Sequence, residues 1–359
     1  MKYTLSMVVV FLIVFATAFT KQKRMSQVIW KVTTIAGGAK GNKATDGTGL
    51  QAQFTGSMSN CIFNSADELY VLDDIILRKL DTAAAVTSLM DILHIQDKYE
   101  ELNFKHIPGE GGGICIDKEG NIYVSNKKHA AIYKIKNEKT AELYAGKKDG
   151  KSGEHLNRLS AKFTSPNDIC MDKFGNMYVA NDYSIQKISA AGIVTTLAGE
   201  STKGSFRTGF GKAAAFSKIK CIAVDSKGTV FVGQYGSSGC IAKILPQGVV
   251  SNFVGDFNDP KERSNPNGRG NAARFMKIQA LAFDEYDNLI VGETTRIRKV
   301  SPEGNVITIA GSKTADWKDG LGTKAMFKNI GGLCVDSKGN ILVSDQYCIR
   351  KMTMQYSNQ

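Results

Sequence analysis

A short phrase, VTTIAG, recurs along this chain and constrains its fold more than any other feature. Clear copies and looser variants stand at residues 32–37, 141–146, 194–199, 251–255 and 306–311. Each internal copy follows a strand-like segment with the pattern I-x-K. The first copy has no such segment before it, and the last such segment, residues 349–352, has no copy after it. The chain therefore begins with the piece that its last repeat lacks. This predicts a closed ring in which the N-terminal strand completes the final unit.

Each repeat carries a phenylalanine, then an apolar strand that ends at an acidic or amide turn residue. These turn residues are Asn64, Asp117, Asp172, Asp225, Asp284 and Asp336. They recur about every 55 residues, a spacing typical of propeller blades. The turn reads D-x-x-G-N or a close variant, and it leads into a second strand, a third strand with the I-x-K pattern, and VTTIAG as the fourth. We therefore expect an all-β protein, a six-bladed β-propeller of four-stranded antiparallel blades.

The N-terminus is distinct from the repeats. An apolar run follows Lys2, and a small-x-small sequence at residues 16–18 is typical of a secretory cleavage site. We expect a signal peptide at residues 1–18, a short segment at 19–31, the propeller at 32–352 and a tail at 353–359. These features predict a secreted, extracellular protein. The alternative is a membrane anchor formed by an uncleaved N-terminal segment, because the run is barely long enough to span a bilayer.

Charge and cysteine content limit the kinds of partner, disulfide and metal site that the sequence favours. The formal net charge of +12 favours anionic partners or solubility. The seven cysteines include no C-x-x-C motif, and Cys115, Cys170, Cys221 and Cys334 fall in equivalent strands. This pattern predicts buried thiols rather than a disulfide framework or a zinc site. The basic residue of each third strand is compatible with a basic band on the rim or with protection against edge pairing.

The motifs together resemble NHL repeats. The resemblance is carried by VTTLAG, a D-G-x-G loop, an A-x-F segment, and D-S-K-G-N followed by I-R-K-M, and it covers most of residues 32–352. It implies a six-bladed propeller with distant similarity to the gluconolactonase-like superfamily. Proteins of these families include extracellular binding modules, RNA-binding domains, a peptide-amidating lyase and metal-dependent hydrolases, so the fold does not specify the function.

Two rings of positions are candidate ligand sites. In the gluconolactonase-like families the metal ligands lie at the mouth of the central channel, where the first strands begin. The polar residues at or beside this ring here are Ser59, Asn167, Asp168, Lys220 and Gln279. The ring position itself offers no carboxylate and one lysine, so we expect no metal and no cofactor. Asn167 and Asp168 resemble part of that family's Pro-Asn-Asp motif, although Asn167 is also compatible with a strand-capping role.

The second ring, here called the polar collar, follows the second strands. Its members are all acids or amides: Asp73, Asn126, Asn181, Gln234, Glu293 and Asp345. Such side chains either hold turns in place or contribute to a ligand surface. We expect a secreted binding or interaction module that uses the loop-rich face of the propeller. The alternative is an enzyme, a gluconolactonase-like hydrolase or a lyase, with a polar pocket at the channel mouth. The expected partners are a protein, a glycan or a small anionic ligand. Nucleic acid is not expected, and a membrane only through the N-terminal segment.

Overall fold

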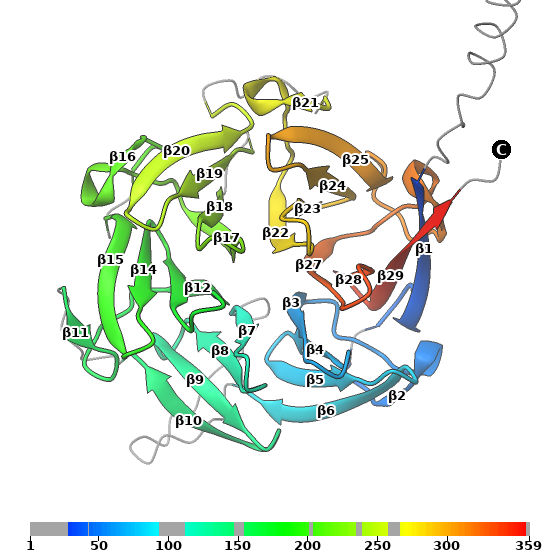
Figure 1. Ribbon diagram of the computed structural model, residues 1–359. Helices are drawn as coiled ribbons and strands as arrows, with labels where there is room; N and C mark the ends of the chain where they lie inside the picture. Colours follow the sequence, from blue (N-terminus) through cyan, green and yellow to red (C-terminus); the bar gives the residue numbers. More distant parts are fainter. Residues whose placement is uncertain are drawn as a thin grey trace, which may run out of the picture.

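The computed structural model describes residues 28–41, 43–92, 112–146, 154–200, 204–234, 239–257 and 266–356. The predicted signal peptide at residues 1–18 lies outside these ranges. None of the helices in the described ranges has the length and apolar character needed to cross a bilayer. The described residues form six antiparallel sheets, the blades, arranged as a ring with the first strands nearest its axis (Figure 1). The predicted fold class is confirmed.

The first strand of each blade lies innermost, and each touches the first strands of both neighbouring blades. From blade 1 to blade 6 these strands are β3 (Met58–Phe63), β7 (Ile114–Ile116), β12 (Pro166–Met171), β17 (Ile219–Val224), β22 (Ile278–Phe283) and β27 (Ile330–Val335). The second strands are β4 (Leu69–Asp73), β8 (Ile122–Asn126), β13 (Met177–Asn181), β18 (Val230–Gln234), β23 (Leu289–Glu293) and β28 (Ile341–Asp345). Nearly every residue of the second strands is buried, because both faces pack against other blades.

Outside these lie the third and fourth strands. The third strands are β5 (Ile76–Leu80), β9 (Ala131–Lys136), β14 (Ser184–Ile188), β19 (Ile241–Ile244), β24 (Arg296–Val300) and β29 (Cys348–Tyr356). The fourth strands are β6 (Ala85–Asp91), β10 (Thr140–Ala145), β15 (Ile193–Gly199), β20 (Val249–Val254), β25 (Asn305–Gly311) and, for blade 6, β1 (Val28–Gly37). The recurring VTTIAG phrase thus forms the fourth strand of five blades, and the segment AVTSLMD takes this place in blade 1.

Five blades carry a short fifth strand that the sequence pattern did not predict. These strands are β2 (Gly47–Thr48), β11 (Leu156–Asn157), β16 (Gly209–Phe210), β21 (Gly268–Arg269) and β26 (Gly320–Leu321). In four of the five a 3-10 turn follows directly: Gly49–Gln51, Gly211–Ala213, Gly270–Ala272 and Gly322–Lys324. The glycine-rich loop before each of these blades runs along the outer edge of the fourth strand and adds its own backbone to the sheet. This covers an edge that would otherwise be open to pairing with another chain.

The N-terminal strand closes the ring as predicted. β1 pairs with β29 in an antiparallel register in which Val32 faces Met352 and Ala36 faces Ile349. Figure 1 shows β1, in blue, against β29, in red. A bulge between Thr34 and Ala36 interrupts the ladder, and Asp319 of the glycine-rich loop accepts the Thr34 backbone N–H at 3.0 Å. The paired segment begins at Val28 and continues to Tyr356.

The D-x-x-G-N motif forms the tight turn between the first and second strands. The Asp172 carboxylate accepts the backbone N–H groups of Phe174 and Asn176, both at 2.9 Å. Gly175 has a φ of 81°, a conformation that strains residues with a Cβ. Asp67 and Asp287 take the glycine position in two blades at positive φ. Their carboxylates accept the N–H and hydroxyl groups of Ser337 and Ser226 in the preceding blade, which gives these turns a second role in joining blades.

The glycine that ends the VTTIAG phrase packs against the phenylalanine of the next blade. Gly37 has a φ of 77°, and a Cβ there would lie 2.8 Å from the Phe54 ring. The equivalent phenylalanines Phe163, Phe216, Phe275 and Phe327 are at most 2% exposed. Phe104, predicted to play this role in blade 2, lies outside the described residues. The core therefore consists of apolar layers between neighbouring blades, which leaves the ends of the first strands around the channel.

Candidate functional site at the channel mouth

The predicted mouth residues lie on the innermost strands, at the end of the channel where the first strands begin. Ser59 is on β3, Asn167 and Asp168 on β12, Lys220 on β17 and Gln279 on β22. The structure brings Asn167, Asp168 and Lys220 together with residues of blades 1 and 2. Ser59 and Gln279 are half-buried on the other side of the mouth, and the Ser59 hydroxyl is buried with no hydrogen-bond partner.

Asp168 joins three blades from a position that is 4% exposed. Its Oδ2 accepts the Ile222 backbone N–H of blade 4 at 2.8 Å, and its Oδ1 accepts the Asn60 amide of blade 1 at 2.6 Å. The Oδ1 also accepts the Ile169 N–H at 2.9 Å. Gly113 of blade 2 makes room, because a Cβ there would lie 2.3 Å from Oδ1. The carboxyl group thus links blades 1, 3 and 4 through hydrogen bonds.

Burial raises the pKa of Asp168 to about 7, against the opposing effects of the Ile222 and Ile169 N–H groups and the Lys220 and Lys127 charges. The carboxyl group therefore changes its charge near neutral pH. The thiols of Cys115, Cys170 and Cys221 share this environment, where burial is the main cause that raises their pKa values and the nearby Asp168 adds to the effect. A raised carboxyl pKa of this kind is common at functional sites.

Lysines from two blades gather around this carboxyl group. Lys127 follows β8 in blade 2, and its pKa is lowered, first by burial and then by the charges of Lys220 and Lys218 in blade 4. Lys218 directly precedes β17, and Lys220 lies at the bulge between Ile219 and Cys221, so both lysines stand where this strand begins. Positive charge from blades 2 and 4 therefore converges above Asp168.

Asn167 and Asp182 complete this side of the mouth. The Asn167 amide donates to Asp182 Oδ1 at 3.0 Å and to the Ile219 carbonyl at 3.3 Å. Lys218 Nζ lies 3.9 Å from the same Asp182 oxygen. Asp182 has a φ of 54° in the turn between β13 and β14, a conformation that aspartate tolerates better than most residues. The strand-capping role of Asn167 is thus visible in its bond to Ile219.

These residues do not fit a divalent cation. A hard cation needs several oxygen ligands. The Asp168 oxygens already accept three N–H groups, and Asn167 turns its amide nitrogen toward Asp182. Lys127, Lys218 and Lys220 would repel a cation at this mouth. Among the described residues, no group of three His, Cys, Asp or Glu side chains has a geometry suited to metal binding.

The polar collar residues are buried, and their side-chain oxygens accept hydrogen bonds from backbone N–H groups of the same blade. Asp345 Oδ1 accepts the N–H groups of Lys328 and Asn329 at 2.8 Å, and Asn181 does the same for Thr164 and Ser165. Asp73, Gln234 and Glu293 hold the equivalent segments, and Asn126 accepts the His129 N–H instead. The collar therefore fixes the segment between the phenylalanine and the first strand.

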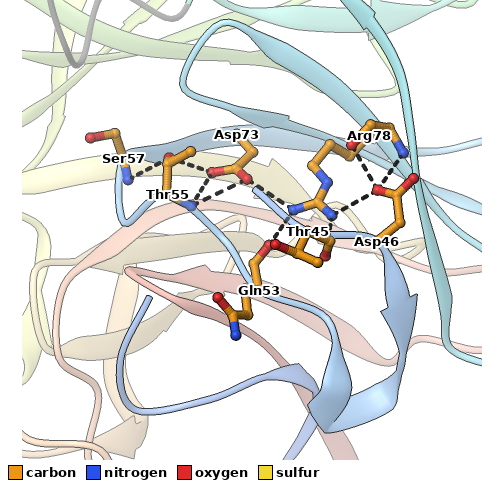
Figure 2. A network of polar contacts seen from close by, with 8 residues as sticks. Thr45, Asp46, Gln53, Thr55, Ser57, Asp73 and Arg78 are labelled. Carbon is orange, nitrogen blue, oxygen red and sulfur yellow. Dashed lines mark hydrogen bonds and ion pairs between the residues drawn. The ribbon is translucent and has the colours of Figure 1, made fainter. Parts of the chain in front are cut away.

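The third-strand arginines are not on the rim, in contrast to the basic-band interpretation. Arg78 is fully buried, and Figure 2 shows it between Asp73, at 3.1 Å, and Asp46, at 3.1 Å. Its guanidinium group also stacks over Phe54 at 4.7 Å. Arg298 repeats this arrangement with Glu293 and the Phe275 ring. Arg350 repeats it with Asp345, Asp319 and the Phe327 ring. The terminal guanidinium nitrogens meet carboxylates and carbonyls of the anchor and glycine-rich loops, which offsets much of the cost of burial, while each Nε atom is buried without a hydrogen-bond partner.

Sequence reasoning missed four residues of the mouth. Asn60, Lys127, Lys218 and Asp182 reach it from blades 1 to 4. Lys127 and Asp182 each directly follow a collar residue. The set of positions one residue after the collar therefore includes both. Lys218 lies two residues before Lys220 in the sequence, next to the start of β17. Asn60 had no signal in the sequence, because its contact with Asp168 crosses blade 2.

Comparisons with known proteins support the fold. None of the protein-family models matches the chain. Human Teneurin-4 is 25% identical over 158 residues, which is 40% of this chain and 6% of Teneurin-4. The chain thus corresponds to a small part of this relative.

Solved structures match over most of the chain. An auxiliary nutrient binding protein from Bacteroides ovatus has a TM-score of 0.66 and 17% identity, with 92% of this chain and 78% of that chain covered. A gluconolactonase from Xanthomonas campestris has a TM-score of 0.57 and 12% identity, with coverage of 91% and 90%. The chain is a six-bladed propeller similar to the NHL and gluconolactonase type. At these identities the likeness establishes the fold alone.

Proposed function

We propose that the protein is a secreted binding module whose channel mouth, between blades 2 and 4, holds an anionic group of a small ligand or glycan. The observation that carries this proposal is the convergence of Lys127 and Lys220 on the buried Asp168, with Lys218 next to them beside Asp182. Ammonium groups in a partly dehydrated setting bind carboxylate, phosphate or sulfate groups more strongly than surface lysines do. The similarity in fold to nutrient binding proteins supports a binding role.

Calorimetric titration with inorganic phosphate, citrate and a sulfated disaccharide tests this proposal, with the unsulfated disaccharide as a neutral control. We expect at least one anionic probe to bind and Lys220→Glu to weaken it by about tenfold or more, because the substitution reverses a charge at the mouth. Lys187→Glu is the matched control, since Lys187 lies on β14 over the Tyr178 ring. It should change the affinity about twofold at most, through screened long-range charge. Equal effects of the two substitutions, or no binding of any anionic probe, would contradict the proposal.

A second candidate function is catalysis, and the acidity of Asp168 favours it. A buried carboxyl group with a pKa of about 7 is suited to general acid–base chemistry near neutral pH. A lactone-hydrolysis assay on the wild type and Asp168→Asn distinguishes the candidates. Turnover that Asp168→Asn abolishes, while anion binding persists, would favour an enzyme over a binding module.

A further inference from the structure

Two of the seven cysteines lie close together, on neighbouring blades. Cys61 is on β3 of blade 1 and Cys334 is on β27 of blade 6, and their Sγ atoms are 3.2 Å apart. Both residues are buried, at 5% and 3% exposure. Blade 6 contains the pairing of β1 with β29 that completes the ring, so the two thiols lie where the first and last blades meet.

Glycines of β27 explain why these strands come so close. A Cβ at Gly331 would lie 1.9 Å from the Met58 carbonyl oxygen, and one at Gly332 would lie 2.4 Å from the Ser59 carbonyl oxygen. The hydroxyl of Ser344 also donates to the Ser59 carbonyl at 2.8 Å. The backbones of blades 6 and 1 therefore meet without intervening side chains. Two residues farther along the two strands, the sulfur atoms of Cys61 and Cys334 come into contact.

We propose that Cys61 and Cys334 form a disulfide bond that joins the first blade to the last. A disulfide needs a sulfur–sulfur distance of about 2.05 Å, so the two atoms must approach by about 1 Å. The oxidant is a small-molecule disulfide such as glutathione disulfide. One cysteine thiolate attacks it and releases one glutathione thiolate, and the second cysteine then displaces the other. Two thiol protons and two electrons leave the protein, and the oxidant becomes two glutathione thiols.

The bond should form during folding rather than afterwards. Burial and the contact with Cys61 raise the pKa of Cys334 well above that of a free thiol, so little thiolate exists in the closed ring. Before the first and last blades meet, both thiols are open to solvent and to the oxidant. A secretory route, which the N-terminal sequence predicts, would place folding in an oxidising compartment.

The bond would also restrict motion of the strands at the channel mouth. Asn60 directly precedes Cys61 and donates its amide to Asp168. A covalent link at Cys61 would restrict the motion of β3 against β27 and so hold Asn60 in position. The long chain separation of the two cysteines also makes the link an effective constraint on the unfolded state.

The test is to refold the full chain from denaturant in a buffer of reduced and oxidised glutathione, then to map the thiols by mass spectrometry. We expect the intact mass to fall by two hydrogen atoms and digestion to yield a peptide pair joined through Cys61 and Cys334. The oxidised protein should unfold roughly 10 °C above the reduced protein, because the link from Cys61 to Cys334 closes a loop of about three-quarters of the chain.

The control is the double variant Cys115→Ala with Cys170→Ala, which removes two thiols on the neighbouring first strands β7 and β12. It should retain the mass loss and the joined peptides, whereas Cys61→Ala should lose both. The wild-type measurement stands alone if a variant does not fold. Seven free thiols in the refolded native protein, or a link between any other pair of cysteines, would overturn the proposal.

Discussion

Blades 5, 6 and 1 use their buried charges differently from blades 2, 3 and 4. Each of the first three pairs a buried arginine with a collar acid: Arg298 with Glu293, Arg350 with Asp345 and Arg78 with Asp73. In the other three blades Tyr133, Gln186 and Ala242 occupy the arginine position, and the collar residue is an amide. One half of the ring contains the closure and carries the ion pairs that hold its loops. The other half carries the lysines and the buried carboxyl group at the mouth.

The difference shows how a repeated scaffold separates stability from binding. A buried arginine depends on its acid and the surrounding carbonyl groups for stability, so it is suited to fixing a loop and unsuited to meeting a ligand. The amide blades fix the same loops with neutral hydrogen bonds. This leaves the charged groups of blades 2 to 4 for the channel mouth.

The largest expected effect is the loss of ring closure. Deleting residues 28–37 removes β1, which supplies the fourth strand of blade 6 and the Thr34 contact with Asp319. We expect the deletion to abolish cooperative unfolding, because two sheet edges become open and the apolar residues beneath β1 are exposed. Thermal unfolding followed by circular dichroism measures this. Deletion of residues 1–27 is the control, since it retains β1, and it should leave the unfolding transition in place.

The next effect compares the two halves directly. Arg350→Met should lower the free energy of unfolding by about 3 to 5 kcal/mol, because it leaves Asp345 buried without its partner. Gln186→Met, at the equivalent position of blade 3, should lower it by only about 1 kcal/mol, because a single neutral hydrogen bond from Asn181 is lost. Urea denaturation of both variants and the wild type measures the difference. Equal losses would show that the arginine blades have no special role in stability.

The last effect concerns the mouth half and appears only as the pH changes. The pKa of Asp168 is raised from 3.8 to about 7 in the folded state, so its protonation favours folding. That contribution is fully present below pH 3.8 and is lost as the pH rises through about 7. Asp168→Asn removes the titration. The stability of the variant relative to the wild type should therefore rise by on the order of 4 kcal/mol between acidic and mildly alkaline pH. A constant difference across urea denaturations at several pH values would show that Asp168 keeps an ordinary acidity.

The buried arginines show how far sequence patterns reach. Collar acids occur only in the repeats whose third strand carries an arginine, so the pairing of Asp73 with Arg78 was visible in the sequence as a correlation between repeats. The burial of the arginines was not visible, since the third strands also carry lysines, which are only half-buried. Burial follows from the phenylalanine and the glycine-rich loop, which enclose the guanidinium group from both sides.

The sequence by itself determined the six blades and the closure of the ring. These follow from local strand pairing and from the period of the repeat, which places equivalent residues at equivalent points of the ring. Only the tertiary structure decided that Asp168 meets Asn60 and Ile222, that lysines of two blades converge on it, and that Cys61 touches Cys334. These contacts cross between blades, and they depend on how closely neighbouring first strands approach. That approach is set by glycines such as Gly113 and Gly332, whose missing side chains leave no mark in the repeat pattern.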